Sequence, residues 1–137
     1  MGNLVISPGV LDEVIRHAKS AYPKEGCGLI AGMRPSLVGV RLIPITNIAS
    51  SASQFEMDPA ELINNLRDLR HAGEELVAIY HSHPHGPARP SAIDVRRAYN
   101  PEAAHLIVSL ADPECPQVAA FRIVDEQVLD IEVHAIV

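Results

Sequence analysis

Side chains able to bind a metal ion gather in one short stretch of the sequence. His81 and His83 are two residues apart, and Ser91 and Asp94 follow within fourteen positions. In a strand, residues i and i+2 point to the same face, so both imidazoles can reach one point in space. A helix beginning near Ser91 would carry Asp94 in its first turn, and the loop before it is long enough to fold back. The spacing predicts two nitrogen ligands and one carboxylate ligand.

Two histidines and one aspartate suit Zn²⁺, and three protein ligands leave the fourth tetrahedral position open for water. An open position is typical of a catalytic site with one zinc ion per chain. Hydrolysis also needs a group that takes a proton from water and delivers it to the leaving amine. Glu25 is the candidate, because Gly26-Cys27-Gly28 behind it allows close approach of a neighbouring strand.

These positions, from Glu25 through His81-x-His83 to Ser91 and Asp94, resemble the signature of the JAMM/MPN metalloprotease family. The resemblance extends over essentially the whole chain, because residues 23–32 look like the glutamate-bearing strand of stand-alone bacterial members and residues 44–47 like their next strand end. It implies that His81, His83 and Asp94 bind zinc, that Glu25 is the general acid/base and that Ser91 donates to the oxyanion.

The resemblance also implies a reaction and a substrate class. The reaction is hydrolysis of a peptide or isopeptide bond after the flexible C-terminal tail of a ubiquitin-like or sulfur-carrier protein, including release of cysteine from a carrier. The chain has no room for the long insertions of eukaryotic members, which favours a small bacterial carrier. Monomer and homodimer both stay open.

Composition restricts the other possible partners. The chain has 137 residues with a net charge of −6, so it lacks the basic excess that nucleic acids and anionic lipids attract. No apolar run approaches the roughly 20 residues that span a bilayer, and no signal sequence is visible at the start. Two cysteines suit a reducing cytoplasm. We expect one cytoplasmic domain over residues 1–137 that binds neither nucleic acid nor membrane.

Each candidate also has an ordinary structural explanation. Ser91 and Asp94 alone would be a helix-capping pair, and Glu25 alone would be a surface glutamate. Cys27 is expected to pack as a small buried side chain. Some other polar residues are predicted to face solvent: His17, His71, His85, His105, His134, Arg89, Arg96 and Arg97. A metal-free MPN-type scaffold is the alternative function, whereas the motifs of zinc deaminases and of helical His-Glu-x-x-His proteases are absent.

Local signals predict the elements that must position these residues. Apolar runs predict strands at 4–6, 26–31, 37–45, 76–80, 105–110, 118–124 and 128–133. Helices are expected from Ser7-Pro8 to Pro23, from Asp58-Pro59 with Glu61 closing a capping box, and from Ser91 to about Ala98. This order predicts an α/β domain, and the resemblance implies a mixed, mostly antiparallel curved sheet with about three helices, the cytidine-deaminase-like fold class.

Overall fold

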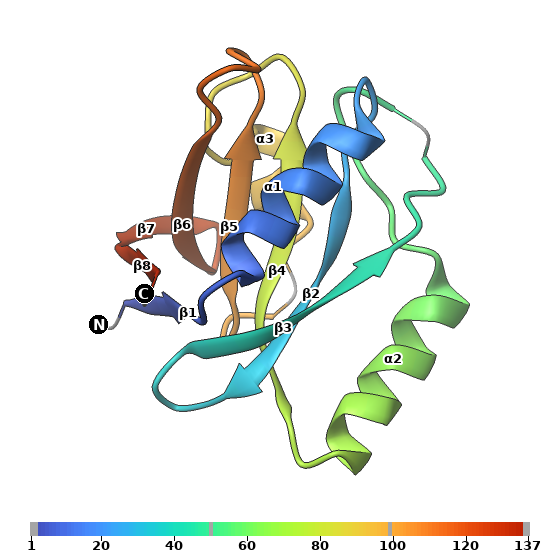
Figure 1. Ribbon diagram of the computed structural model, residues 1–137, viewed down its shortest axis with the longest axis vertical. Coiled ribbons are helices and arrows are strands. Elements are labelled where there is room, and N and C mark those ends of the chain that lie inside the picture. Colours follow the sequence, from blue (N-terminus) through green and yellow to red (C-terminus); the bar gives the residue numbers. More distant parts are fainter. Residues whose placement is uncertain (1–2, 50, 99, 136–137) are drawn as a thin grey trace.

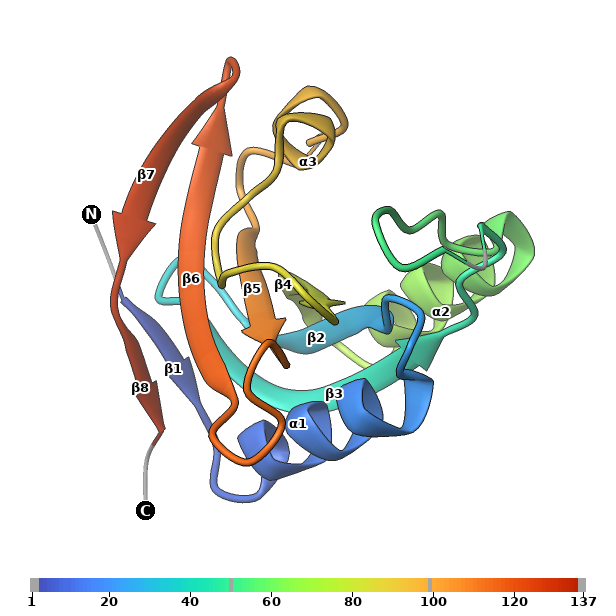
Figure 2. The same ribbon diagram turned by 90° about the horizontal axis from the view of Figure 1, so that it is seen from above.

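A computed structural model describes residues 3–49, 51–98 and 100–135. Within these ranges, eight strands form one mixed sheet in the order β7-β6-β5-β4-β2-β3-β1-β8. Neighbours are antiparallel except for β4-β5, β1-β3 and β1-β8, which are parallel. Figures 1 and 2 show the strong curvature of the sheet. The strands are β1 (Leu4–Ile6), β2 (Cys27–Met33), β3 (Val38–Ile45), β4 (Glu75–His83), β5 (Ala104–Ser109), β6 (Gln117–Val124), β7 (Gln127–Ile131) and β8 (Val133–Ala135).

Three helices cover the two faces of this sheet. Helix α1 (Val10–Ala21) lies on one face, while α2 (Pro59–His71) and α3 (Ala92–Arg96) lie on the concave side (Figure 2). The predicted fold class is therefore confirmed: a mixed, mostly antiparallel sheet with three flanking helices.

Helix α1 packs its apolar stripe on the sheet as its periodicity predicts. Val10, Val14 and Ala18 are buried in a core built with strand residues of β1, β2, β4 and β5. The predicted start at Ser7 and Pro8 is wrong, because Gly9 precedes the helix with a left-handed φ of 83°. The amide of Ser7 donates to the carbonyl of Gly39 in β3, which continues the pairing of β1 with β3 through this residue.

Helix α2 begins as predicted, with one difference. The side chain of Asp58 accepts hydrogen bonds from the amides of Ala60 and Glu61, and Pro59 occupies the first turn. Glu61 does not close a capping box on Asp58. Its carboxylate instead accepts from the amide of Thr46 at 2.9 Å, because β3 ends next to the helix start and offers an unpaired donor there.

The strand predictions hold for the hairpin and fail at the C-terminal end. β2 and β3 form the expected antiparallel hairpin. The segment predicted as one strand over 128–133 is divided, because β7 pairs with β6 whereas β8 pairs with β1. The Glu132 carbonyl between them accepts from the amide of Leu4. In the part of the chain that the structure describes, no helix has the length and apolarity to cross a membrane.

Candidate metal centre

Strand β4 places both histidines on one face of the sheet. It extends through His83, so the two imidazoles stand at the carboxyl end of a central strand, as predicted. Because side chains alternate along β4, Ala78 and Tyr80 lie in the core under α1, and Ile79 lies on the side of α2. His81 and His83 share the side of Ile79 and are 1% and 7% exposed.

The third predicted ligand is supplied by the start of α3. Ser91 accepts a hydrogen bond from the amide of Asp94, and the Asp94 carboxylate accepts from the amide of Ser91 at 2.8 Å. The capping pair that these residues would form on their own is thus present. Because it fixes the first helical turn, it also holds the carboxylate of Asp94 over the end of β4.

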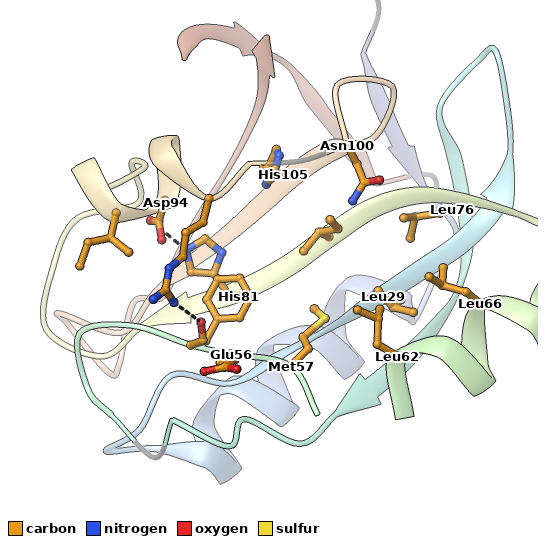
Figure 3. Close-up of a pocket in the computed structure, with 14 residues that line it drawn as sticks. Leu29, Glu56, Met57, Leu62, Leu66, Leu76, His81, Asp94, Asn100 and His105 are labelled. Carbon is orange, nitrogen blue, oxygen red and sulfur yellow. Dashed lines mark hydrogen bonds and ion pairs between the residues drawn. The ribbon is translucent and has the colours of Figure 1, made fainter. Parts of the chain in front are cut away.

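Three ligand atoms meet at one point. The Nε2 atoms of His81 and His83 are 3.1 Å apart, and each lies 3.1 Å from Oδ2 of Asp94. Zinc–nitrogen bonds of about 2.0–2.1 Å at tetrahedral angles separate neighbouring ligand atoms by about 3.3 Å. The triangle therefore has the size that a zinc ion requires. Figure 3 shows His81 and Asp94 facing each other at one end of a cavity.

Hydrogen bonding orients the ring of His83 for a cation. Its Nδ1 donates to the carbonyl of Pro87 at 2.8 Å, so the neutral ring carries its lone pair on Nε2. This lone pair points at the carboxylate of Asp94, and two acceptors so close together call for a positive charge between them. A backbone carbonyl behind the ligand ring is a usual feature of zinc sites.

The electrostatics of the cluster agree with this arrangement. Burial raises the pKa of Asp94, but hydrogen bonds with His81 and His83 outweigh that effect and hold its pKa below the usual range. For His81, burial is the largest influence and lowers its pKa. For His83, burial lowers the pKa, but hydrogen bonds with Asp94 and with the Pro87 carbonyl outweigh it and raise the pKa. Asp94 is thus an anion beside the neutral imidazole of His81, and these are the forms of the two groups that bind a metal.

Glu25 lies beside the same cluster and is not the surface residue that its type alone suggests. It is 3% exposed, and a carboxylate oxygen lies within 4.8 Å of ring nitrogens of His81 and His83. Antiparallel pairing of β2 with β4, which sets Cys27 opposite His81, brings it there. The glycine after Glu25 allows this approach as expected, because a Cβ at Gly26 would lie 2.7 Å from the hydroxyl oxygen of Tyr80 in β4.

The carboxylate of Glu25 is also electrostatically unusual. Burial is the main cause that raises its pKa to about 7; the charge of His83 lowers it and that of Asp94 raises it. One of its oxygens, Oε1, is buried and has no hydrogen-bond partner. A group of this kind exchanges protons near neutral pH, as a general acid/base must.

A cavity of about 450 Å³ extends from the histidine–aspartate triangle along the concave side (Figure 3). Its polar end carries His81, Asp94, Arg97 and His105, and its apolar end is formed by Leu29, Met57, Leu62, Leu66, Leu76 and Ile79. Phe55 closes one side, because its ring stacks on that of His81 with centroids 4.6 Å apart. The cavity therefore joins a polar end at the triangle to an apolar end beside α2.

Two residues of this wall were not expected from the sequence. His105, predicted to face solvent, is 7% exposed, and burial lowers its pKa to about 4, followed by the charge of His81. Its place inside the apolar run 103–108 was an available signal of burial. No sequence pattern indicated that Phe55 would lie against His81, because this contact depends on how the loop that carries Phe55 folds.

The remaining predictions on polar residues have mixed outcomes. Cys27 is fully buried, and burial raises its pKa to about 12, so it packs as expected. His85 is exposed and its ring lies against Tyr22, away from the triangle. His17 is half-buried and bonded to Tyr80 rather than free in solvent. The other five residues predicted to face solvent are exposed: Arg89, Arg96, Arg97, His71 and His134.

A family model described as prokaryotic homologs of the JAB domain matches residues 7–124, which include all five candidate site residues. The chain belongs to this family. It is 35% identical to the CysO-cysteine peptidase of Mycobacterium tuberculosis over 133 residues, which cover 97% of this chain and 91% of the relative. It is 42% identical to a probable TtuB-protein conjugate cleaving protease of Thermus thermophilus, over 69% of this chain and 63% of the relative.

A solved structure supports the same fold. A protein from Desulfitobacterium hafniense matches with a TM-score of 0.87 and 36% identity, over 97% of this chain and 92% of that protein. The chain is therefore similar to this protein in both fold and sequence over nearly its whole length.

Proposed function

We propose that this JAB-family protein is a zinc-dependent metallopeptidase of the JAMM type. It hydrolyses a peptide or isopeptide bond at the C-terminal tail of a ubiquitin-like or sulfur-carrier protein. The observation that carries the proposal is the triangle of His81, His83 and Asp94, with ligand atoms 3.1 Å apart, beside a buried carboxylate with an unpartnered oxygen. Relatives named as peptidases of carrier-protein conjugates support the substrate class.

Two carboxylates stand near the histidines, and we assign them different tasks. Asp94 is the ligand, because its Oδ2 is equidistant from both Nε2 atoms and is fixed by the amide of Ser91. Glu25 is the general acid/base, since its buried Oε1 has no hydrogen-bond partner in the protein and is therefore not committed to another group.

Zinc, when bound, supplies a Lewis acid that polarises the scissile carbonyl and lowers the pKa of water. Glu25 takes the proton of the attacking water and delivers it to the leaving amine, for which a pKa of about 7 is well matched. The oxygen of Ser91 already accepts from the amide of Asp94, so its own hydrogen is available to donate to the developing oxyanion.

The substrate fits the cavity and the charge of the protein. A flexible tail can lie extended in the cavity of about 450 Å³ and present its last peptide bond to the triangle. Release of cysteine from a carrier belongs to this proposal, since the relative that covers 97% of the chain is named for CysO-cysteine. A net charge of −6 does not favour nucleic acid, and two free cysteines suit the cytoplasm.

The zinc content of the purified chain tests the metal centre. After dialysis against metal-free buffer, addition of one equivalent of zinc and removal of unbound zinc by gel filtration, elemental analysis should give a ratio near one. The chain should then cleave a ubiquitin-like carrier extended by one cysteine, and Glu25→Gln should keep the zinc while turnover falls at least about 10²-fold. A ratio near zero with zinc supplied would favour the metal-free scaffold, and full activity in the variant would remove Glu25 from the reaction.

A further inference from the structure

The backbone of Glu25 is not held by the main sheet. Strand β2 begins two residues later, at Cys27, so Glu25 lies before the first ladder pair. Its amide donates instead to the carbonyl of Ser51, and its carbonyl accepts from Nδ2 of Asn47 at 2.9 Å. Since Oε1 of its side chain has no partner, the placement of this carboxylate depends strongly on its main chain.

Asn47 makes more hydrogen bonds than this one. Its Oδ1 accepts from the amides of Ala49 and Glu56, each at 2.9 Å, and its Nδ2 also donates to the carbonyl of Gln54 at 3.4 Å. The side-chain carboxamide of Asn47 thus holds together the segments on both sides of a loop. We call residues 51–57 the strap.

The strap forms one wall of the candidate site. Phe55 stacks on His81, and its carbonyl accepts from Arg97 at 3.4 Å. At its end, Met57 bridges back to Asn47 and also lines the cavity. Through Asn47, the strap and the main chain of Glu25 are therefore joined directly.

We propose that Asn47 is a positioning residue that holds Glu25 and the strap as one unit. Its carboxamide is suited to this task because it donates and accepts at the same time. The donor side fixes the acid/base residue, and the acceptor side, together with the longer donation to the Gln54 carbonyl, fixes the wall against which the tail lies. This inference rests on the proposed role of Glu25. Misplacement by about 1 Å is enough to cost about 10²-fold in rate, so turnover is sensitive to this contact.

Two substitutions separate the two sides of the carboxamide. Asn47→Asp keeps an oxygen for the amides of Ala49 and Glu56 but loses the donation to the Glu25 carbonyl and the longer donation to the Gln54 carbonyl. Asn47→Ala removes both the donor and the acceptor of the carboxamide. Asn65→Ala is the matched control, because that asparagine also donates to a backbone carbonyl, that of Glu61 at 2.7 Å, but does so on α2 and outside the cavity lining.

Steady-state cleavage of the carrier–cysteine substrate and amide hydrogen exchange test the inference together. Both Asn47 variants should bind one zinc and lose about 10- to 100-fold in kcat, with a smaller change in KM for Asn47→Asp. Exchange should increase around Glu25 in both variants, and within the strap it should increase most in Asn47→Ala, which also loses the acceptor for the Glu56 amide. Asn65→Ala should match the unsubstituted chain in kcat.

Several outcomes would overturn the inference. These are unchanged kcat in both Asn47 variants, loss explained wholly by lost zinc or unfolding, and an equal loss in Asn65→Ala. If the unsubstituted chain cleaves no carrier, the proposed function fails separately. Amide hydrogen exchange then still tests whether Asn47 positions Glu25, because unchanged protection at Glu25 in Asn47→Asp would disprove that role.

Discussion

The two faces of the sheet differ in how well their buried groups are satisfied. Under α1, strand residues such as Ala78, Tyr80 and Leu106 form a continuous apolar core, and the Tyr80 hydroxyl is bonded to His17 at 3.0 Å. On the concave side, the buried atoms without partners include one each in Glu25, His81 and His105. Unpaired buried polar atoms cost stability, so the three beside the candidate metal centre indicate function there, although Nε of Arg34 and Nε of Arg122 are also unpaired elsewhere in the described residues.

The same strand serves both faces. In β4, Tyr80 belongs to the apolar core, whereas His81 and His83 belong to the candidate metal centre. A change on one face should therefore alter stability and leave chemistry intact, while a change on the other should do the reverse. The following substitutions test this division, in order of decreasing effect.

His83→Ala should have the largest effect on activity. Two remaining ligands hold zinc poorly, so the zinc ratio should fall from near one to near zero and turnover should fall at least about 10³-fold. Elemental analysis and carrier cleavage measure this, and circular dichroism should show an unchanged fold. Retention of a full equivalent of zinc would mean that the ligand set is wrong.

Leu106→Ala should have the largest effect on stability. Leu106 is fully buried under α1, so its truncation should lower the free energy of unfolding by about 2–5 kcal/mol. Urea denaturation measures the loss. The kcat of the folded fraction should stay within twofold, and a large fall in kcat at full zinc occupancy would contradict the division of the faces.

The zinc-free protein should lose stability as the pH rises, because of Glu25. Burial raises its folded pKa from 4.5 to about 7, so the folded state binds more protons than the unfolded state between these values. The stabilising contribution is complete below pH 4.5 and is lost as the pH rises through 7, by at most roughly 3 kcal/mol.

Glu25→Gln should remove this dependence. Urea denaturation of both zinc-free chains at pH 4.5 and pH 8 gives the difference, and the variant should gain relative stability at the higher pH. Parallel pH curves would show that Glu25 does not titrate in this range.

Ser91→Ala tests a residue with two tasks. Loss of the hydroxyl should lower kcat by about 10²-fold if it donates to the oxyanion. Loss of the helix cap alone should cost about 1 kcal/mol of stability. Comparing kcat at full zinc occupancy with the urea midpoint separates these effects, and a stability loss with unchanged kcat would leave Ser91 as a cap.

Tyr80→Phe should have the smallest effect. It removes the hydrogen bond to His17 inside the apolar face, which should cost about 1 kcal/mol of unfolding free energy. Zinc content and kcat should not change, although His81 is the next residue. A fall in zinc content would show that the two faces are coupled through β4.

The sequence by itself determined the local parts of the site. Strand alternation put His81 and His83 on one face, and capping chemistry put Asp94 in the first turn of a short helix. These features depend on backbone geometry within a few residues, so periodicity and residue type predict them. The same logic failed for the start of α1, where a hydrogen bond to β3 holds Ser7 and the helix begins only after Gly9.

Only the tertiary structure decided which distant residues meet. Pairing of β2 with β4 brings Glu25 to histidines more than fifty positions away, and folding of the strap brings Asn47 to its carbonyl. His105 is buried because β5 pairs with β4 beneath the cavity. Strand order and loop placement are set by the packing of the whole sheet against three helices, and no local pattern encodes that choice.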